Sequence, residues 1–385
     1  MTTKRTINIL LATVLIFLFA CKGTIDKKQE LSFEDKVNDY IQKFPYQDTY
    51  NYMVSYTGAD PSKLNKLTET IPILTKAGED KIVRMNNDTY YTGGFVYLIN
   101  GSVKISATYS DPKRFYSFQL IDDKNCNFLN IINPEGDYYL YYDIKPKGIK
   151  EEQLIKSPSL IAGVITRVEV KNKYNAKDVQ TAQKVFNGVN ISGPEIKEFP
   201  KLDLLSSFED AVAKRANQLM DSVFANVPFK ELVASPDQVP NEVSFLKLAA
   251  GTKGGWGGPL ATHSSYQMMF FDDIGNVLDG SKGTYTLTTE EPKVDAFWSV
   301  TVYDTERGGF FHPNKYDLYH INNTTAIRNE DGTITFNFKS NCEEGDTNCL
   351  EVPEGKFDLA VRYYLPHESL ISGEWTMPLP KLQIK

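Results

Sequence analysis

Alternating apolar and polar residues in the last third of the chain restrict that region to antiparallel sheets. Ile334, Phe336 and Phe338 alternate with polar residues, and the same period of two runs through residues 357–364. Because successive side chains of a strand point to opposite faces, each strand has one apolar and one polar face. Residues 251–385 are therefore predicted to form a sandwich, and we expect a jelly roll. Its expected strands cover 266–271, 283–289, 297–303, 333–338 and 356–364.

A second strand-rich region lies between residues 81 and 169. The dipeptide Asn100-Gly101, which follows an apolar run, is a strong signal for a hairpin turn. Short strands at regular spacing favour a sandwich over a parallel sheet with crossover helices. An amphipathic helix is expected over residues 32–44, and we assign residues 32–174 to one N-terminal sandwich. Its expected strands cover 95–99, 103–109, 115–121, 138–144 and 163–170.

Between these two regions the apolar residues recur every three or four positions, as in a helix. Ser206 and Glu209 have the spacing of a capping box. The glycine-rich stretch around Trp256 is followed by Pro259 and not by the Lys-Ser/Thr of a phosphate-binding loop, so we interpret residues 252–259 as a linker or lid. Helices are expected at 178–185, 208–223 and 242–250 of a helical domain that covers residues 175–250.

The first 21 residues have the layout of a secretory signal. Lys4 and Arg5 precede an apolar run, and the residues before Cys21 resemble the bacterial lipobox, whose cysteine becomes the lipidated N-terminus. The run is shorter than the roughly 20 residues that span a bilayer; a short anchor or an ordinary signal peptide is the alternative. We expect a signal peptide at 1–20, a tether at 21–31 and attachment to the outer membrane or the periplasmic face of the cell envelope.

Charge and cysteine content limit the partners of this chain. Without the signal peptide, 40 basic residues oppose 49 acidic ones, and this balance argues against a nucleic-acid partner. In an exported chain, Cys342 and Cys349 are expected to form a disulfide. No second cysteine pair or histidine cluster accompanies them, so we expect no metal. Cys126 is expected to be a buried free thiol.

The sequence contains no standard catalytic motif. The G-x-S-x-G elbow, H-E-x-x-H, the P-loop and a G-x-G-x-x-G after a strand are all absent. His312 and His320 flank one segment and are interpreted as solvated turn residues rather than metal ligands. We therefore expect no cofactor.

Residues 84–91, Arg-Met-Asn-Asn-Asp-Thr-Tyr-Tyr, carry the most informative motif of the first half. They resemble the R-P-N-x-D-T-x-Y motif of the domain of unknown function 1254, although Met85 replaces the proline. We align the motif's tyrosine with Tyr90, with a shift of one position. Later elements of that domain resemble residues 115–122 and a strand that ends at Arg167.

Residues 296–304, Ala-Phe-Trp-Ser-Val-Thr-Val-Tyr-Asp, resemble the most recognisable strand of the domain of unknown function 1214. The family's N-W-L-P segment is replaced by residues 348–351, so its tryptophan is lost. The paired resemblance covers about residues 35–385. It implies an immunoglobulin-like N-terminal sandwich, a small helical domain and a C-terminal jelly roll, but no established reaction.

Two functions follow as hypotheses. The first is a lipid-anchored protein that binds a small molecule, a glycan or a protein partner between its two β-domains. The second is an envelope hydrolase whose aspartates and arginines converge in a cleft, with an arginine holding an anion and an acid acting as base. A homo-oligomer is possible in both cases. The candidate residues are Arg84, Asp88, Tyr90, Arg167, Trp298, Tyr303, Asp304 and Arg362.

Overall fold

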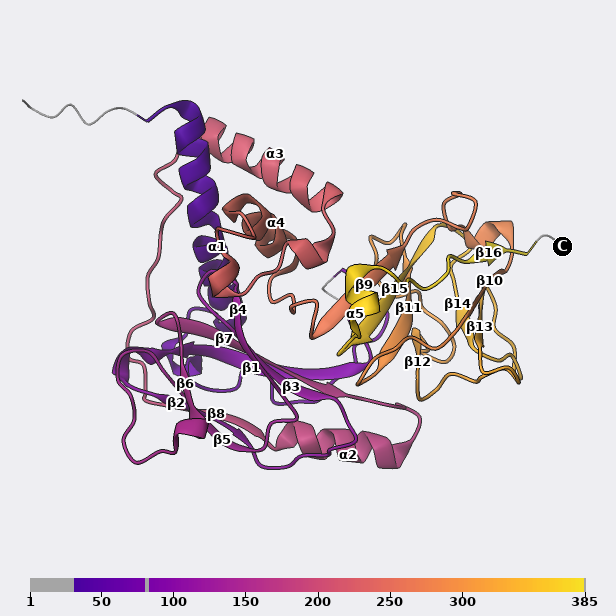
Figure 1. The fold of residues 1–385 in the computed structure, drawn as a ribbon, viewed down its shortest axis with the longest axis horizontal. Helices are drawn as coiled ribbons and strands as arrows, with labels where there is room; N and C mark the ends of the chain where they lie inside the picture. The colour runs from indigo at the N-terminus through magenta and orange to yellow at the C-terminus, as the bar shows by residue number, and fades with distance from the viewer. Residues whose placement is uncertain (1–30, 80–82, 384–385) are drawn as a thin grey trace, which may run out of the picture.

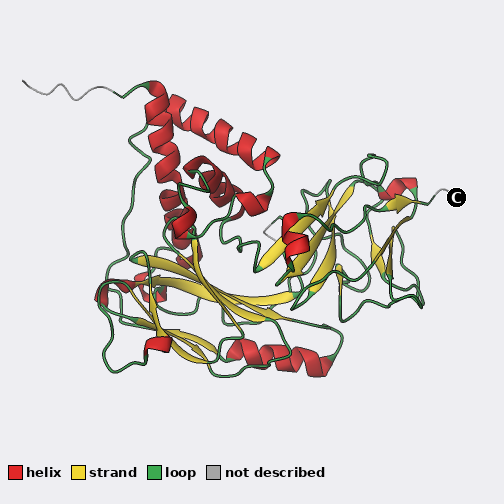
Figure 2. Cartoon of the chain, viewed as in Figure 1, coloured by secondary structure: helices red, strands yellow, loops and turns green. Residues whose placement is uncertain are grey.

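The computed structural model of the chain describes residues 31–79 and 83–383. These residues form a mainly β protein with two sandwiches and one helical unit (Figure 1, Figure 2). The predicted mainly β fold with a helical insertion is confirmed. The predicted signal peptide, Cys21 and the tether up to residue 30 lie outside the described residues. Among the helices described, none is both long and apolar enough to cross a membrane.

The N-terminal sandwich consists of two four-stranded sheets, with strand orders β1-β7-β3-β4 and β6-β5-β2-β8. Their facing sides bury a common core that includes Val96, Phe118 and Leu140. The strands are β1 Thr89–Tyr97, β2 Val103–Ala107, β3 Tyr116–Ile121, β4 Asn127–Ile132, β5 Gly136–Tyr141, β6 Leu154–Lys156, β7 Ile161–Glu169 and β8 Val189–Ser192.

The predicted hairpin at Asn100-Gly101 is wrong. Strand β1 pairs with β7, whereas β2 pairs with β5 and β8, so the chain crosses from one sheet to the other after β1. The dipeptide does form a tight turn, in which Gly101 has a φ of 130°. A turn signal is local, but strand pairing depends on which face each strand must bury.

Helix α2 (Ala176–Asn187) and strand β8 pack with the N-terminal sandwich and not with the predicted helical domain. Ala182, Val185 and Phe186 of α2 join the sandwich core. Strand β8 pairs with β2. The amphipathic helix buries its apolar side against the sheet. This sandwich therefore extends to Ser192, beyond the expected boundary at residue 174.

The C-terminal sandwich also has two four-stranded sheets, ordered β12-β11-β15-β9 and β14-β13-β10-β16. The predicted alternation holds on β13, where Ile334, Phe336 and Phe338 are buried in the core. A disulfide joins Cys342 to Cys349. The elements are β9 Ser264–Met269, β10 Tyr285–Thr289, β11 Trp298–Asp304, β12 His320–Asn322, β13 Ile334–Lys339, β14 Cys349–Glu351, β15 Phe357–Tyr364, α5 Glu368–Ser372 and β16 Lys381–Leu382.

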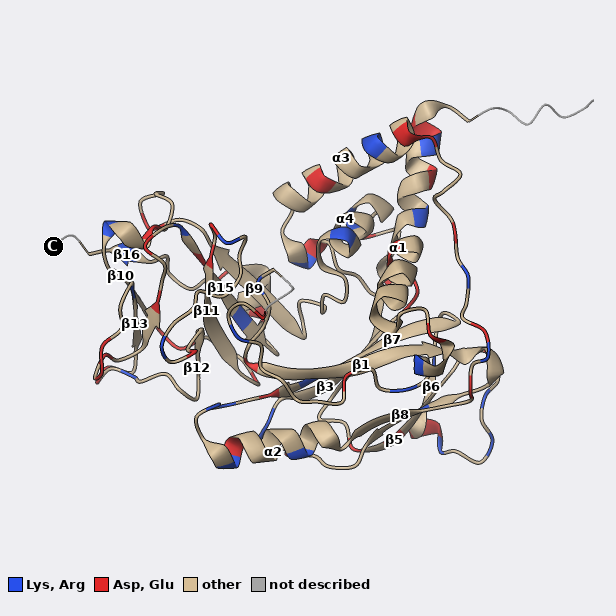
Figure 3. Ribbon diagram, turned by 180° about the vertical axis from the view of Figure 1, so that it is seen from behind, with Lys and Arg blue, Asp and Glu red and all other residues tan. Residues whose placement is uncertain are grey.

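The helical unit is discontinuous in sequence. It combines α1 (Phe33–Thr57) with α3 (Asp210–Asn226) and α4 (Phe245–Gly255), which share one apolar core. Acidic and basic residues both occur along α1 and α3 (Figure 3). The predicted capping box at Ser206 is wrong: Ser206 bonds back to Asp203, and Glu209 is the N-cap of α3.

The glycine-rich stretch is not the predicted linker or lid. Helix α4 runs through Gly255, and Trp256 then fills the space between the helical unit and the N-terminal sandwich. Its indole stacks on Tyr52 of α1 with ring centres 4.1 Å apart, lies against Phe95 of β1 and donates to Thr49 Oγ1 at 3.1 Å. Trp256 therefore anchors α1 and α4 to the sheet.

Candidate ligand site between the sandwiches

The segment that leads into β1 joins the two sandwiches through Arg84. The guanidinium of Arg84 donates to both carboxylate oxygens of Asp358 on β15, at 2.9 and 2.8 Å. Asp358 is fully buried and also accepts from Thr305 Oγ1 at 2.9 Å. The backbone N–H of Arg84 donates to the carbonyl of Gly309 at 2.9 Å. The charge of Arg84 is thus compensated within the protein.

Arg362, also on β15, makes a second link. Its Nη2 donates to the carbonyl of Arg84 at 2.7 Å and to Tyr303 Oη at 2.8 Å, and its Nη1 donates to Thr301 Oγ1 at 3.1 Å. Tyr303 in turn donates to the carbonyl of Met85 at 2.6 Å. Burial raises the pKa of Tyr303 to about 12, although the charge of Arg362 acts in the opposite direction. Tyr303 therefore stays neutral at ordinary pH.

Asp88 is buried at the same junction. It accepts hydrogen bonds from Ser299 Oγ and from Tyr364 Oη, the latter at 3.3 Å. Asn86 accepts from the backbone N–H of Asp88 at 2.6 Å and donates to Tyr364. His320, expected in a solvated turn, is buried near Asp88; burial lowers its pKa to about 4, against the opposing charge of Asp88. His320 is therefore neutral at pH 7, and the site gains no cation from it.

Arg167 on β7 has no acidic partner among the described residues. Its guanidinium donates to the side chain of Gln119 and to the carbonyl of Gly257 at 3.4 Å. It lies 5.4 Å from the ring centre of Tyr91, its cross-strand neighbour on β1. The residue is only 7% exposed. Because a buried charge without a counter-charge costs several kcal/mol, Arg167 is the strongest candidate for a ligand contact.

The C-terminal sandwich presents the same combination of side chains. Arg362 lies 5.9 Å from the ring of Tyr266, its cross-strand neighbour on β9. Burial raises the pKa of Tyr266, while Arg167 and Arg362 both lower it, so both guanidiniums lie near this phenol. Tyr91 and Tyr266 are partly exposed. We call Arg167, Tyr91, Arg362 and Tyr266 the arginine–tyrosine cluster.

The arginine–tyrosine cluster and its described surroundings carry an excess positive charge. Arg84 and Asp358 neutralise each other. The charge of Asp88 acts on Arg362. Arg167 has no counter-charge of its own, since the tyrosines do not ionise near pH 7. The charges of the described residues at this position therefore sum to a net positive value.

Three predicted site residues do not take part in the contacts at the junction of the two sandwiches. Tyr90 lies in the N-terminal core against Phe186. Trp298 is buried in the C-terminal core, where it packs edge-on against Phe336. Asp304 shapes a turn by accepting from the backbone of Arg307 at 3.0 Å. These three side chains are scaffold residues.

Tyr91, Tyr266, Tyr364 and Gln119 were missed from the sequence. A usable signal existed for Tyr91, because the period of two places it on the opposite face of β1 from Tyr90. Counted from Arg84, the tyrosine of the R-P-N-x-D-T-x-Y motif falls on Tyr91 without a shift, so the alignment with Tyr90 is wrong. No comparable signal existed for Tyr266, whose role depends on how the two sandwiches pack.

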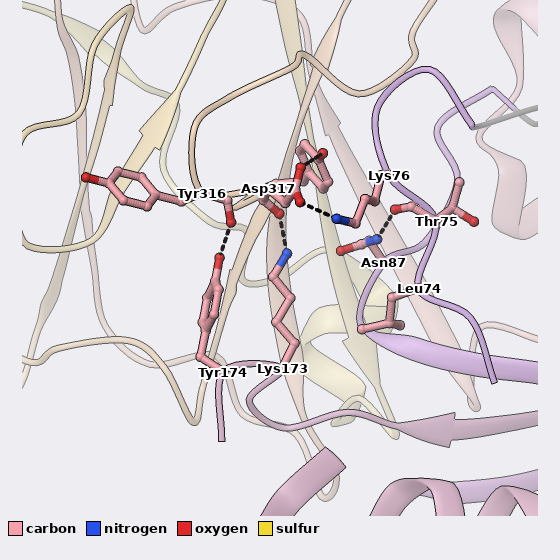
Figure 4. A pocket seen from close by; sticks show the side chains of 9 residues that line it. Leu74, Thr75, Lys76, Asn87, Lys173, Tyr174, Tyr316 and Asp317 are labelled. Atoms are coloured by element: carbon pink, nitrogen blue, oxygen red, sulfur yellow. Dashed lines mark hydrogen bonds and ion pairs between the residues drawn. The ribbon is translucent and has the colours of Figure 1, made fainter. Parts of the chain in front are cut away.

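A cavity of about 210 Å³ lies at the same junction and has walls from both sandwiches. Figure 4 shows Lys173 pointing toward Asp317, to whose carbonyl it donates, and Lys76 pairing with the Asp317 carboxylate at 2.7 Å. Burial lowers the pKa of Lys173 to about 8; Asp317 opposes this shift and Lys76 adds to it. The side chain of Asn87, from the 84–91 motif, also lines the cavity. These contacts hold the sandwiches together around a space lined by two amines.

Two family profiles match successive parts of the chain. The profile described as "Protein of unknown function (DUF1254)" matches residues 68–190, and that described as "Protein of unknown function (DUF1214)" matches residues 263–368. The chain belongs to the family that pairs these two domains. The DUF1254 domain supplies Arg84, Asp88 and Arg167, and the DUF1214 domain supplies Tyr303 and Arg362, so the junction described above joins the two family domains.

A solved structure supports the fold. The crystal structure of the VPA0106 protein from Vibrio parahaemolyticus is 19% identical, with a TM-score of 0.77 over 91% of this chain and 100% of that chain. This similarity shows the fold alone. An uncharacterized protein from Burkholderia cenocepacia is 11% identical over 89% of this chain and 86% of its own, and its TM-score of 0.47 carries no argument. No curated protein sequence matches the chain.

Proposed function

We propose that this DUF1254–DUF1214 protein is a lipid-anchored cell-envelope protein that binds a small anionic ligand at the arginine–tyrosine cluster. The observation that carries the proposal is Arg167, a buried arginine with no acidic partner in the described part of the chain. A guanidinium binds a carboxylate or a phosphate through two parallel hydrogen bonds. The ligand therefore supplies the negative charge that the surrounding residues lack.

The tyrosines narrow the class of ligand. Tyr91 and Tyr266 place a ring and a phenol beside each arginine, and both are partly exposed. Tyrosines of this kind pack on a flat apolar face and hydrogen-bond at the ring edge. An acidic sugar or another small carboxylate with a compact ring meets both requirements. We favour this class over a neutral glycan, because a neutral glycan leaves Arg167 without a counter-charge.

The hydrolase alternative receives less support from the geometry. It requires two carboxylates that face one substrate, and Asp88 and Asp304 were the candidates. Asp88 accepts from Ser299 and Tyr364, whereas Asp304 shapes a separate turn and lies 3.4 Å from His312 Nδ1. Asp358 is held by Arg84. The described acids at the junction serve the scaffold, so binding is the better-supported function.

Titration calorimetry on residues 22–385 tests the proposal with glucuronate, glucose and inorganic phosphate as probes. We expect glucuronate or phosphate to bind and glucose not to bind. Arg167→Gln should weaken binding of the anion at least tenfold. Arg215→Gln, the same substitution at an exposed position of α3, is the matched control and should bind as the parent does. Equal binding of anions by the Arg167→Gln variant, or no binding of either anion, would contradict the proposal.

A further inference from the structure

A second cavity, of about 270 Å³, lies away from the sandwich junction, between α1 and the N-terminal sandwich. Tyr46 and Tyr50 of α1 form one side, and Tyr97 and Ile161 of the sheet form another. Asp123 is the acidic residue of its wall, and Lys201 lies at its exposed rim. Drug-sized ligands occupy pockets of about 300 Å³ or more, so this cavity suits a ligand of only a few heavy atoms.

The carboxylate of Asp123 is available to a ligand. The neighbouring Asp122 uses its own carboxylate to organise the turn, accepting from the backbone N–H groups of Lys124 and Cys126 at 2.9 Å each. Lys124 Nζ lies 3.6 Å from the same Asp122 side chain. No other described side chain pairs with the Asp123 carboxylate; its one hydrogen bond is with its own backbone. Asp123 thus presents to the cavity a carboxylate that no described side chain pairs with directly, although the charge of the nearby Lys124 acts on it.

Three tyrosine side chains line the cavity together with Asp123. The hydroxyl of Tyr50 donates to the carbonyl of Pro200 at 3.1 Å, so its ring is the part left for a ligand. Burial raises the pKa of the Tyr46 phenol; the charge of Lys124 lowers it and that of Asp123 raises it, so both charged groups lie near this ring. Aromatic rings attract organic cations, most strongly where water is excluded. A carboxylate among several rings is a combination that recognises ammonium groups.

We propose that this cavity binds a small organic ammonium ion, with Asp123 as its counter-ion and the rings of Tyr46, Tyr50 and Tyr97 around its alkyl groups. The site is separate from the arginine–tyrosine cluster and does not depend on the anion-binding function. Lys201 at the rim is the one described cation of the wall, and its charge opposes the ligand. Because the charge of Lys201 would repel a cation and attract an anion, removing this charge distinguishes a cation site from an anion site.

Binding of choline to residues 22–385, compared with 3,3-dimethylbutan-1-ol, tests the proposal by calorimetry at pH 8. The alcohol has nearly the shape of choline but no charge. Choline should bind at least tenfold more tightly than the alcohol. Asp123→Asn should weaken choline binding at least tenfold, and Tyr97→Leu several-fold. Asp143→Asn, at an exposed position outside the cavity, is the matched control and should leave binding unchanged.

Lys201→Met provides a second, independent variant on the exposed rim, which keeps the test decisive if Asp123→Asn fails to fold. It should strengthen choline binding about threefold, because a repelling charge is removed. Weaker choline binding by Lys201→Met overturns the proposal in favour of an anion site. Equal affinity for choline and the alcohol overturns it in favour of an apolar cavity without charge recognition, and no choline binding by the parent overturns it outright.

Discussion

Arg84 has a backbone φ of 51°, in the left-handed region that residues with a side chain rarely adopt. The conformation is kept because the carbonyl of Arg84 accepts from Arg362 and its side chain pairs with Asp358. The Arg84 side chain is 31% exposed, whereas that of Asp358 is fully buried. The pair is thus a partly buried link whose acid cannot move into water.

Asp358→Asn should therefore lower the free energy of unfolding. Breaking a fully buried ion pair costs about 3–5 kcal/mol; the partial exposure of Arg84 reduces the expected loss to about 2–3 kcal/mol. Urea unfolding of residues 22–385 measures it. Glu151→Gln breaks the exposed pair with Lys145 and should change stability by less than about 1 kcal/mol. Equal effects of the two substitutions would show that the Arg84–Asp358 pair contributes no more than a surface contact.

Asp123 makes stability depend on pH. Burial, followed by the charge of Asp122, raises the pKa of Asp123 to about 7, while Lys124 lowers it. Tyr46, Cys126 and Lys201 are the other described titratable groups around it. Between about pH 4 and pH 7 the folded state keeps a proton that the unfolded state has lost, so this residue makes stability fall as pH rises.

Asp123→Asn removes that proton linkage. The variant should be more stable than the parent at pH 8, by about 1–2 kcal/mol after allowance for solvent screening of a partly exposed group. At pH 4 the two proteins should be nearly equal. Thermal unfolding at both pH values measures the difference. The same gain at pH 4 and pH 8 would mean that the ionisation of Asp123 is not its source.

At the scale of elements, Trp256 decides how the helical unit meets the N-terminal sandwich. It contacts Tyr52 and Thr49 of α1 and Phe95 of β1. Gly163 on β7 leaves room for the indole, since a Cβ there would lie 3.1 Å from Trp256 Cη2. Trp256→Ala should destabilise the protein by about 3 kcal/mol and speed amide exchange in α1. Trp256→Phe is the milder control; unchanged exchange in the alanine variant would assign the docking of α1 to other contacts.

The disulfide belongs to edge strand β14, which pairs in parallel with β13 and begins at Cys349. It closes a short loop, with seven residues of sequence separation. In the chain-entropy model a loop of this length stabilises by about 2–3 kcal/mol. Replacing Cys342 and Cys349 by serine should lower the unfolding free energy by that amount, and reducing agent should have no further effect on the variant. Two alkylated thiols in the untreated parent would contradict the bond itself.

The positions of helices and strands could be predicted from the sequence more reliably than which of these elements pack against one another. Period-two segments such as residues 334–338 became strands because each needs only one buried face, which is local information. The grouping of α1 with α3 and α4, and of α2 with a sheet, depends on contacts far apart in sequence. The same reason explains which site residues could be predicted. Arg84, Asp88 and Arg362 were found from family motifs, but Tyr266 becomes part of the site only through the packing of the two sandwiches.

At the scale of the whole molecule, α1 begins at the outer end of the helical unit, far from the C-terminal sandwich (Figure 1). A lipid on Cys21, ten residues before Leu31, would therefore hold the protein by its helical unit. The two sandwiches, with the arginine–tyrosine cluster between them, would then lie farther from the membrane. Such an arrangement suits a ligand that arrives from the surrounding solution.

Cys21→Ser tests this arrangement in the full chain. A thioether to a diacylglycerol requires the cysteine sulfur, and lipid chains of this kind supply most of the membrane affinity because each buried CH₂ contributes about 0.8 kcal/mol. The parent should sediment with membranes and stay there in high salt, whereas Cys21→Ser should be found in the soluble fraction. Cys126→Ser controls for loss of a thiol elsewhere, since Cys126 is buried, and should sediment as the parent does. Persistent sedimentation of Cys21→Ser after the salt wash would mean that the apolar segment, and not a lipid, holds the protein to the membrane.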